Sequence, residues 1–242
     1  MFSKKHIKLD SVDSTNNYAL SMKGTLPFEE GLVVTANYQT SGNGQRGKCW
    51  ESSVGENVLI SIVIEPNIST KNQFLLSKCV ALAVYDLLTL YTDDVSIKWP
   101  NDILVGKQKI AGILIKNILK GNEITHSVIG VGLNVNQTKF KVYSPQATSL
   151  KLLLHKTFDI SIIQEELLKC LAERIKQLRS GIHQEKEYLS ALFFKHKVAA
   201  FESEGQKFIG IIKGVNQSGK LQIQLEDDIV TEFDNQEVKF LF

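Results

Sequence analysis

In the first 180 residues or so, the apolar residues form two kinds of run. Short runs that are rich in β-branched residues and bounded by Gly, Asn or Pro predict β-strands. Longer runs whose apolar residues recur every three or four positions predict α-helices. The predicted strands cover residues 32–38, 58–64, 95–99, 110–116 and 125–135, and the predicted helices cover residues 74–91 and 160–178. Because strands and helices do not alternate strictly, we expect an α+β fold in which helices cover one face of a mixed β-sheet.

The pattern changes near Lys195, where apolar and polar residues begin to alternate over several short runs. Alternation with a period of two predicts half-buried strands, so we expect a small β-barrel at the end of the chain. A connecting helix is predicted over residues 185–196, and two domains are predicted over residues 1–190 and 194–242. The turns of the barrel are predicted at Glu204-Gly205, Ser218-Gly219 and Asp227-Asp228.

Composition narrows the class of protein. With 242 residues, of which 43% are hydrophobic and 22% charged, the chain is long enough to bury a core without disulfides or structural metals. The three cysteines form no CxxC pair, which argues against a disulfide framework or a zinc site. The chain shows no secretion signal and no apolar run of membrane-spanning length, so we expect a soluble, cytoplasmic protein that contacts no membrane. A formal net charge of +2 gives no broad positive surface for nucleic acid.

A polar cluster, KWPND at residues 98–102, ends the third predicted strand. A core has no use for a lysine, an amide and a carboxylate side by side, so such a cluster usually binds a ligand. Proline restricts its own φ and favours an extended residue before it, which would present the cluster in a defined geometry. The alternative is that Trp99 belongs to the core and Asp102 caps the turn. A predicted hairpin over residues 103–114 brings Lys109 back beside the cluster and leaves Lys107 at the tip in solvent.

A glycine-rich segment, QTSGNGQRGKCW at residues 39–50, imitates two nucleotide-binding motifs. Gly42, Gly44 and Gly47 satisfy G-x-G-x-x-G, and Lys48 stands where a P-loop has its lysine. Both motifs require a helix directly after the loop, and a P-loop also requires Ser or Thr after its lysine; neither condition is met. Two interpretations remain: a flexible surface loop, or a mobile loop whose N–H groups and cations surround a phosphate.

Two weaker signals flank these motifs. DSTNNY at residues 13–18 predicts the start of a short helix capped by Ser14 or Thr15. VIGVGLNVN at residues 128–136 places two glycines near the end of a strand. There they mark either a β-bulge or a place where a ligand approaches the backbone.

Together, the segments DSTNNY, YQTSGNGQRGKCW, IKWPND, KIAGIL and VIGVGLNVN resemble the catalytic domain of a biotin protein ligase. The resemblance spans most of the chain. It implies the class II synthetase-like fold of biotin and lipoate ligases for residues 1–190 and an SH3-like barrel for residues 194–242. It also implies an ATP-dependent ligase that activates biotin as biotinyl-5'-AMP and transfers it to a lysine of a biotin carboxyl carrier protein. ATP and biotin are the implied substrates, with Mg²⁺ as the accompanying ion.

Residue roles follow from the same resemblance, position by position. Biotin contacts are expected at Ser14, Thr15, Asn16, Gln39, Gly42, Gly44, Gln45 and Gly112. ATP or adenylate contacts are expected at Arg46, Gly47, Lys48, Trp50, Lys98, Asn101 and Asn134. Catalytic roles are expected for Lys109, Asp102 and Arg46, and Asp102 is also a candidate magnesium ligand. Many members of the family carry arginine where this chain has Asn43 and Gln45, so the positive charge of the loop rests on Arg46 and Lys48.

The implied chemistry suits these residue types. A carboxylate must attack the α-phosphate of ATP, which brings two anions together, before an amine can open the mixed anhydride. Lysine, arginine, N–H groups and magnesium offset that repulsion, and a glycine loop over the adenylate excludes water. We therefore expect residues 42–51 to be open or disordered without ligand and to close over biotin or biotinyl-AMP.

Other functions have to be distinguished from this one. A lipoate protein ligase shares the fold and the adenylate chemistry but would carry a different glycine motif in place of KWPND and GxGQRG. A non-enzymatic interaction module built on the C-terminal barrel would leave the polar residues at 98–109 without a role. DNA binding is not expected, because the DSTN motif begins about a dozen residues from Met1 and leaves no room for a helix-turn-helix. The sequence is compatible with a monomer or a homodimer.

Overall fold

The β-rich runs of the first part of the chain form an eight-stranded sheet in the computed structural model, which describes residues 2, 5–25 and 28–241. The Arg46 side chain lies outside the described part. The strand order is β1 (Lys5–Val12), β2 (Leu32–Gln39), β3 (Asn57–Ile64), β8 (Glu123–Asn134), β7 (Gln108–Lys120), β6 (Asp102–Val105) and β5 (Val95–Lys98), and the short β4 (Ile68–Ser69) pairs with β8. β1 and β2 are parallel and the other neighbours are antiparallel. The predicted mixed sheet is therefore confirmed.

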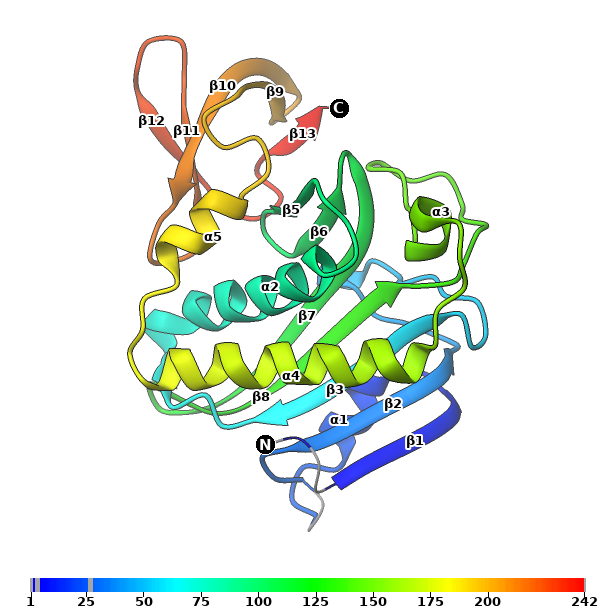
Figure 1. The fold of residues 1–242 in the computed structure, drawn as a ribbon. Coiled ribbons are helices and arrows are strands. Elements are labelled where there is room, and N and C mark those ends of the chain that lie inside the picture. The colour runs from blue at the N-terminus through cyan, green and yellow to red at the C-terminus, as the bar shows by residue number, and fades with distance from the viewer. Residues whose placement is uncertain (1, 3–4, 26–27, 242) are drawn as a thin grey trace.

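Helices cover both faces of this sheet, which corrects the expectation of helices on one face. Val33 of β2 belongs to the core under the long helices, whereas its neighbours Leu32 and Val34 pack with Ala19 of α1 (Thr15–Ser21) on the opposite face. The two long helices, α2 (Gln73–Thr89) and α4 (Ile160–Arg179), lie side by side on the first face (Figure 1). The seven residues of α1 are too few and too polar to show an apolar stripe, so the pattern could not place them.

The connecting helix α5 covers Glu185–Ala191 and stops well before the predicted limit at residue 196. Leu192 is extended, with φ −70° and ψ 125°, and the N–H of Phe193 donates to the carbonyl of Ile97 at 2.9 Å. The apolar residues after Ala191 therefore bury against β5 instead of continuing the helix. The remaining short helices are α3 (Leu150–Leu154), η1 (Gln45–Gly47) and η2 (Thr70–Asn72).

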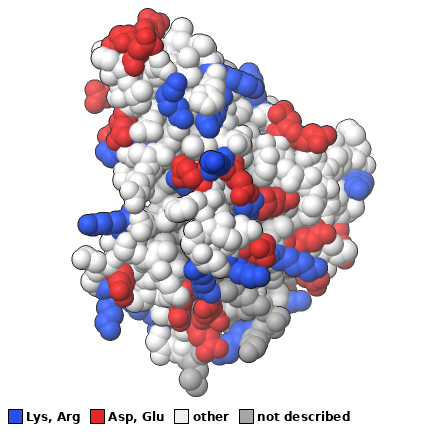
Figure 2. All heavy atoms as spheres, turned by 60° about the vertical axis from the view of Figure 1, so that its left-hand side comes forward, with Lys and Arg blue, Asp and Glu red and all other residues white. Residues whose placement is uncertain are grey.

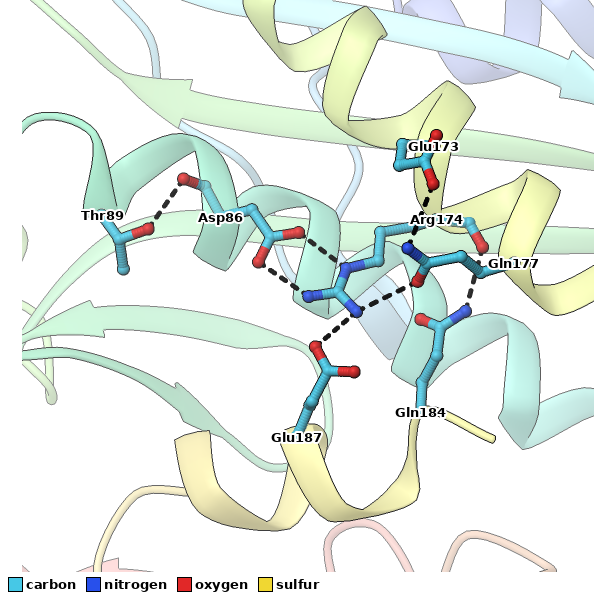
Figure 3. A network of polar contacts seen from close by, with 7 residues as sticks. All are labelled: Asp86, Thr89, Glu173, Arg174, Gln177, Gln184 and Glu187. Carbon is cyan, nitrogen blue, oxygen red and sulfur yellow. Dashed lines mark hydrogen bonds and ion pairs between the residues drawn. The ribbon is translucent and has the colours of Figure 1, made fainter. Parts of the chain in front are cut away.

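Arg174 of α4 joins the helices to one another (Figure 3). Its buried guanidinium makes a two-point contact with Asp86 of α2, with N···O distances of 2.6 and 2.9 Å. A third contact, at 2.7 Å, reaches Glu187 of α5. The hydrogen bond to Asp86, followed by that to Glu187, raises the pKa of Arg174, which keeps the guanidinium charged although it is buried. This network is structural, because its members lie outside the cavity described below.

The alternating pattern at the end of the chain forms a second, five-stranded antiparallel sheet (Figure 1), which confirms the predicted strands and is consistent with the small β-domain expected there. Its strand order is β12 (Val230–Phe233), β11 (Leu221–Gln224), β10 (Gln206–Val215), β9 (Val198–Ser203) and β13 (Lys239–Leu241). The three predicted turns lie between consecutive strands of this sheet. The two sheets meet where Nε1 of Trp99 donates to the carbonyl of Gly219 at 2.8 Å, and Trp99 is only 2% exposed. Trp99 therefore belongs to the core, and it also holds the second sheet in place.

The surface carries charges of both signs. On the face drawn in Figure 2, lysine and arginine side chains are interspersed with aspartate and glutamate, in line with the small net charge. Within the described residues, no helix is both long enough and apolar enough to cross a membrane.

Candidate active site

Glycines on neighbouring strands open a hollow in the face of the sheet that carries α1. Gly112 of β7 pairs with Gly132 of β8, and Gly130 stands two residues earlier on β8. A Cβ at Gly132 would lie 2.4 Å from Cε2 of Trp50, and a Cβ at Gly130 would lie 2.6 Å from Nδ2 of Asn16. The register of β7 and β8 is regular at these positions, so the glycines mark a close approach and not a bulge. The hollow continues into a cavity of about 1000 Å³, a size that suits a small organic ligand.

One end of the cavity is a cluster of hydroxyl and amide groups at the start of α1. Ser14 caps the helix, as predicted. Thr15 donates its backbone N–H and its hydroxyl to Oε1 of Gln39, at 2.8 and 3.1 Å. The hydroxyl of Ser61 on β3 lies 2.9 Å from the same Thr15 hydroxyl and can donate to it. Because the Gln39 oxygen already accepts two hydrogen bonds, its NH₂ group is the donor left for a ligand.

Three buried polar atoms of the cavity wall have no hydrogen-bond partner among the described residues. They are Oδ1 of Asn16, Nε1 of Trp50 and Oδ1 of Asn134. The amide nitrogen of Asn134 does have a partner, since it donates to the carbonyl of Thr148 at 2.9 Å and so orients the side chain. A buried polar atom without a partner destabilises the fold by about 1–3 kcal/mol. Three of them around one cavity indicate a polar ligand that supplies the missing hydrogen bonds.

The other end of the cavity holds a carboxylate between two lysines. Nζ of Lys109 lies 2.6 Å from Oδ1 of Asp102, and Nζ of Lys98 lies 3.7 Å from Oδ2. The strand pairing explains the arrangement: the two-residue turn after Val105 folds β7 back along β6, as predicted, so Lys109 points to the end of β5. Lys109 also lies over the ring of Trp50, with 5.5 Å from Nζ to the ring centroid. A second cation on one carboxylate leaves positive charge available for an anionic ligand.

Burial lowers the pKa of Lys98, and the neighbouring cations Lys109 and Lys48 lower it further, whereas Asp102 opposes the shift. The repulsion among these three lysines would fall if an anion entered between them. The electrostatics of this end of the cavity therefore favour a negatively charged ligand, such as a carboxylate or a phosphate.

The donor set does not fit a magnesium ion held by the protein alone. Asp102 is the carboxylate at this point, and both of its oxygens already face lysines. The described residues contain no group of three or more His, Cys, Asp or Glu side chains placed to hold a metal. Mg²⁺ usually binds through one or two carboxylates together with substrate phosphates. Asp102 as a metal ligand therefore stays a prediction.

The glycine loop lies over the cavity and is held by its own backbone. The N–H of Gly44 donates to the carbonyl of Lys48 at 2.6 Å, and the N–H of Trp50 donates to the carbonyl of Gly42 at 2.8 Å. The next regular element is β3, not a helix, which agrees with the rejection of both nucleotide-binding motifs. Gly47, with φ +79°, turns the chain inside this loop, a conformation that glycine adopts without strain.

Most of the predicted site residues come together around the cavity. Those that line it are Ser14, Thr15, Asn16, Gln39, Gly44, Gln45, Lys48, Trp50, Lys98, Asn101, Asp102, Lys109, Gly112 and Asn134. Gly42 and Gly47 belong to the loop but lie outside the lining, and the Arg46 side chain lies outside the described part of the structure. Asn101 uses its amide to donate to the carbonyl of Ile113 at 2.8 Å, so it also holds β7 in place.

Sequence reasoning missed several lining residues. Ser61 had a local signal, because it is the one polar residue in the apolar run VLISIVI. Tyr143 had none; its hydroxyl donates to Oε2 of Glu51 at 2.6 Å, across 92 positions of sequence. Asn235 had none either, and it reaches the glycine loop from the second sheet, where it donates to Gln45 at 2.8 Å. A contact between segments so far apart in sequence produces no recognisable pattern in either segment alone.

A sequence model of the Biotin/lipoate A/B protein ligase family matches residues 9–134, which include the Ser14–Asn16 segment, the glycine loop and the Lys98–Asp102–Lys109 cluster. The chain belongs to this family. Among curated members, the biotin--[acetyl-CoA-carboxylase] ligase of Mycobacterium tuberculosis is 31% identical over 217 residues, which are 86% of this chain and 79% of that protein. The bifunctional ligase/repressor BirA of Bacillus subtilis is 31% identical over 154 residues, 61% of this chain and 46% of that protein. The chain thus spans about half the length of BirA.

Solved structures of the family share the fold. The biotin protein ligase of Aquifex aeolicus in complex with biotin and ATP superposes with a TM-score of 0.80 at 24% identity. The match covers 98% of this chain and 99% of that one, so it includes the C-terminal sheet as well as the eight-stranded sheet.

Proposed function

We propose that this family member is an ATP-dependent ligase that activates biotin as biotinyl-5'-AMP and transfers it to a lysine of a biotin carboxyl carrier protein. One observation carries the proposal: a single cavity joins a hydroxyl–amide cluster at one end to the Lys98–Asp102–Lys109 cluster at the other. Relatives named as biotin--[acetyl-CoA-carboxylase] ligases, in Mycobacterium tuberculosis and Paracoccus denitrificans, support it. An acetyl-CoA carboxylase or a related biotin-dependent carboxylase would supply the acceptor.

The hydroxyl–amide cluster suits the ureido ring of biotin. A urea offers one carbonyl acceptor and two N–H donors, and hydroxyl and amide groups complement both kinds of group. The Thr15 hydroxyl, the Gln39 amide and the unpartnered Oδ1 of Asn16 supply them within the cavity. With the ring at this end, the acyl chain of biotin would run along the glycine hollow toward Lys109.

Lys109 would then meet the biotin carboxylate and the α-phosphate of ATP. Its ammonium offsets the repulsion between the two anions and stabilises the charge that develops on the phosphoryl oxygens during attack. Asp102, 2.6 Å away, holds this ammonium in place and is free to orient the incoming amine once Lys109 turns to the phosphate. The mixed anhydride that forms is opened by the acceptor amine, with AMP as the leaving group. No side chain of the protein needs to form a covalent intermediate.

The nucleotide would lie between the glycine loop and the end of β8. Trp50 offers a ring face and an unpartnered N–H, and Asn134 offers an unpartnered oxygen, as an adenine base requires. Lys48 of the loop lines the same region. Because the described residues offer no group of three acidic, histidine or cysteine side chains for a metal, Mg²⁺ would enter with the triphosphate.

The test is isotope exchange between pyrophosphate and ATP. We expect exchange that depends on biotin and not on lipoate, since only a completed adenylation step returns label to ATP. Exchange that depends on lipoate instead would show a lipoate protein ligase. Absence of exchange with either acid, in a folded protein, would favour the interaction module.

A further inference from the structure

The second sheet reaches the cavity through β13 and through the turn that precedes it. Residues 235–238, between β12 and β13, form this turn, and Asn235, Gln236 and Val238 line the cavity. There Nδ2 of Asn235 donates to Oε1 of Gln45 at 2.8 Å, and both side chains are partly buried. Gln45 opens the 3₁₀ turn at the tip of the loop. The contact therefore joins the tip of the loop to the second sheet, 190 positions later in the sequence.

The sheet that carries Asn235 is held by contacts with the first part of the chain. Gly219, in the neighbouring turn of the same sheet, accepts from Trp99, and a Cβ at Gly219 would lie 2.7 Å from Cδ2 of Phe74 on α2. Asp234, next to Asn235, pairs with Lys220 at 2.9 Å. The second sheet is thus packed closely against the first, and Asn235 does not move freely with its own loop.

Residues 42–48 at the tip of the glycine loop, in contrast, carry no apolar side chain, and the packing of the loop comes from Trp50 at its end, which lies against Gly112 and Gly132. Its tip carries three glycines within six positions, and the N–H groups of Gly44, Lys48 and Trp50 donate to carbonyls within the loop. A segment with few apolar contacts opens at low free energy, so a single external hydrogen bond changes its population measurably. The asparagine–glutamine contact is such a bond.

We propose that Asn235 is a positioning residue that holds the glycine loop over the cavity through Gln45. This inference rests on the proposed function and deepens it, because it assigns the C-terminal sheet a part in retaining the adenylate. When the bond is absent the loop opens more often, and biotinyl-AMP escapes before an acceptor amine arrives. One net hydrogen bond corresponds to about a threefold to tenfold change in an equilibrium of this kind.

A double-mutant cycle tests the contact. Asn235→Ala, Gln45→Ala and the double variant are compared for the rate at which biotinyl-AMP, formed on the enzyme from biotin and ATP, is released into solution. We expect each single variant to release it about threefold to tenfold faster than the unmodified protein, and the double variant to be no faster than either. Multiplied effects in the double variant, or no effect of Asn235→Ala, would overturn the proposal.

Asn216→Ala is the matched control. Asn216 lies in the same sheet, where its amide donates to Oε2 of Glu232 at 2.8 Å, outside the cavity lining. It should leave adenylate release within about twofold of the unmodified rate. Equal release by Asn216→Ala and Asn235→Ala would show that loss of sheet stability, not the loop contact, is responsible.

Hydrogen exchange separates this inference from the proposed function, because it needs no substrate. In the protein alone, the amides of residues 42–51 should exchange about threefold to tenfold faster in Asn235→Ala, while those of β9 and β10 keep their rates. If the unmodified protein lacked biotin-dependent exchange of pyrophosphate, the proposed function would fall and this measurement would still decide the loop contact. Unchanged exchange in residues 42–51 would remove Asn235 from the role.

Discussion

At the residue scale, two lysines of one hairpin allow the effect of a charge inside the cavity to be compared with that of a charge in solvent. Lys109 lies 2.6 Å from Asp102 inside the cavity, whereas Lys107 is exposed at the turn two positions earlier. Lys109→Ala should lower biotin-dependent pyrophosphate exchange by about a hundredfold or more, since one lost electrostatic contact to a transition state costs about 3–4 kcal/mol. Lys107→Ala should stay within about twofold. Equal losses in the two variants, or near-normal exchange by Lys109→Ala, would take Lys109 out of the chemistry.

Two buried serines give a second comparison. Ser61 lies 2.9 Å from the Thr15 hydroxyl, and Ser127 of β8 donates to Oδ1 of Asn117 at 2.7 Å; both serines are fully buried. Ser61→Ala should raise the KM for biotin about threefold to tenfold and leave kcat nearly unchanged, because the Thr15 hydroxyl loses the donor that orients it. Ser127→Ala removes an equivalent hydroxyl away from the cavity and should leave that KM unchanged. A similar rise in both variants would mean that Ser61 acts only through stability.

Most of the site residues found from sequence are polar residues in places where a core or a plain surface would not have them; the others are Trp50 and the glycines. The cluster at residues 98–102 and the segment at residues 13–18 are of this kind, and the structure brings both to one cavity. Asn235 and Tyr143 are ordinary polar residues in polar surroundings. Their place in the site depends on the relative position of distant segments, which local pattern does not encode.

At the scale of elements, the glycine loop carries two cations, Arg46 and Lys48, with the uncharged Asn43 and Gln45 beside them. Lys48 lines the cavity, and Gln45 accepts a hydrogen bond from Asn235, so we expect Lys48 or Arg46 to make the phosphate contact. Lys48→Ala or Arg46→Ala should raise the KM for ATP about tenfold, whereas Gln45→Ala should change adenylate release more than the KM for ATP. Steady-state kinetics at varied ATP would decide. A KM for ATP that responds chiefly to Gln45→Ala would contradict this assignment.

Long apolar runs predicted their elements within one or two residues, as in β3 and α4, because burial on one or both faces leaves a strong pattern. β1 was not predicted, since its residues alternate between half-buried and exposed at the edge of the sheet. The end of α5 was misplaced for the opposite reason: residues 192–194 are apolar enough to continue a helix, yet they bury against β5. The hydrophobic pattern of a sequence indicates that a residue is buried, but it does not indicate which element the residue packs against.

At the scale of the whole molecule, a tryptophan side chain makes a hydrogen bond that joins the two sheets. The chain has two, and each is packed in a narrow space: Nε1 of Trp99 donates to Gly219 at 2.8 Å, while Nε1 of Trp50 has no partner among the described residues. We therefore propose that the limits at residues 190 and 194 separate two units that are joined firmly through Trp99. Replacing either tryptophan by phenylalanine removes the same atoms, so the two variants compare an indole N–H that has a partner with one that has none.

Trp99→Phe should be less stable than Trp50→Phe by at least about 1 kcal/mol, because it loses a buried hydrogen bond whereas Trp50→Phe removes an N–H that has no partner. For a chain of this length that difference lowers the thermal midpoint by about 2–4 °C. Trp50→Phe should show the opposite profile, because its N–H awaits a ligand: its stability changes little beyond the smaller ring, while biotin-dependent exchange of pyrophosphate falls. Calorimetry and the exchange assay on both variants measure the two effects. A Trp50→Phe variant that is less stable than Trp99→Phe would contradict the structural role of Trp99. A Trp50→Phe variant that keeps full exchange would contradict the ligand contact of Trp50.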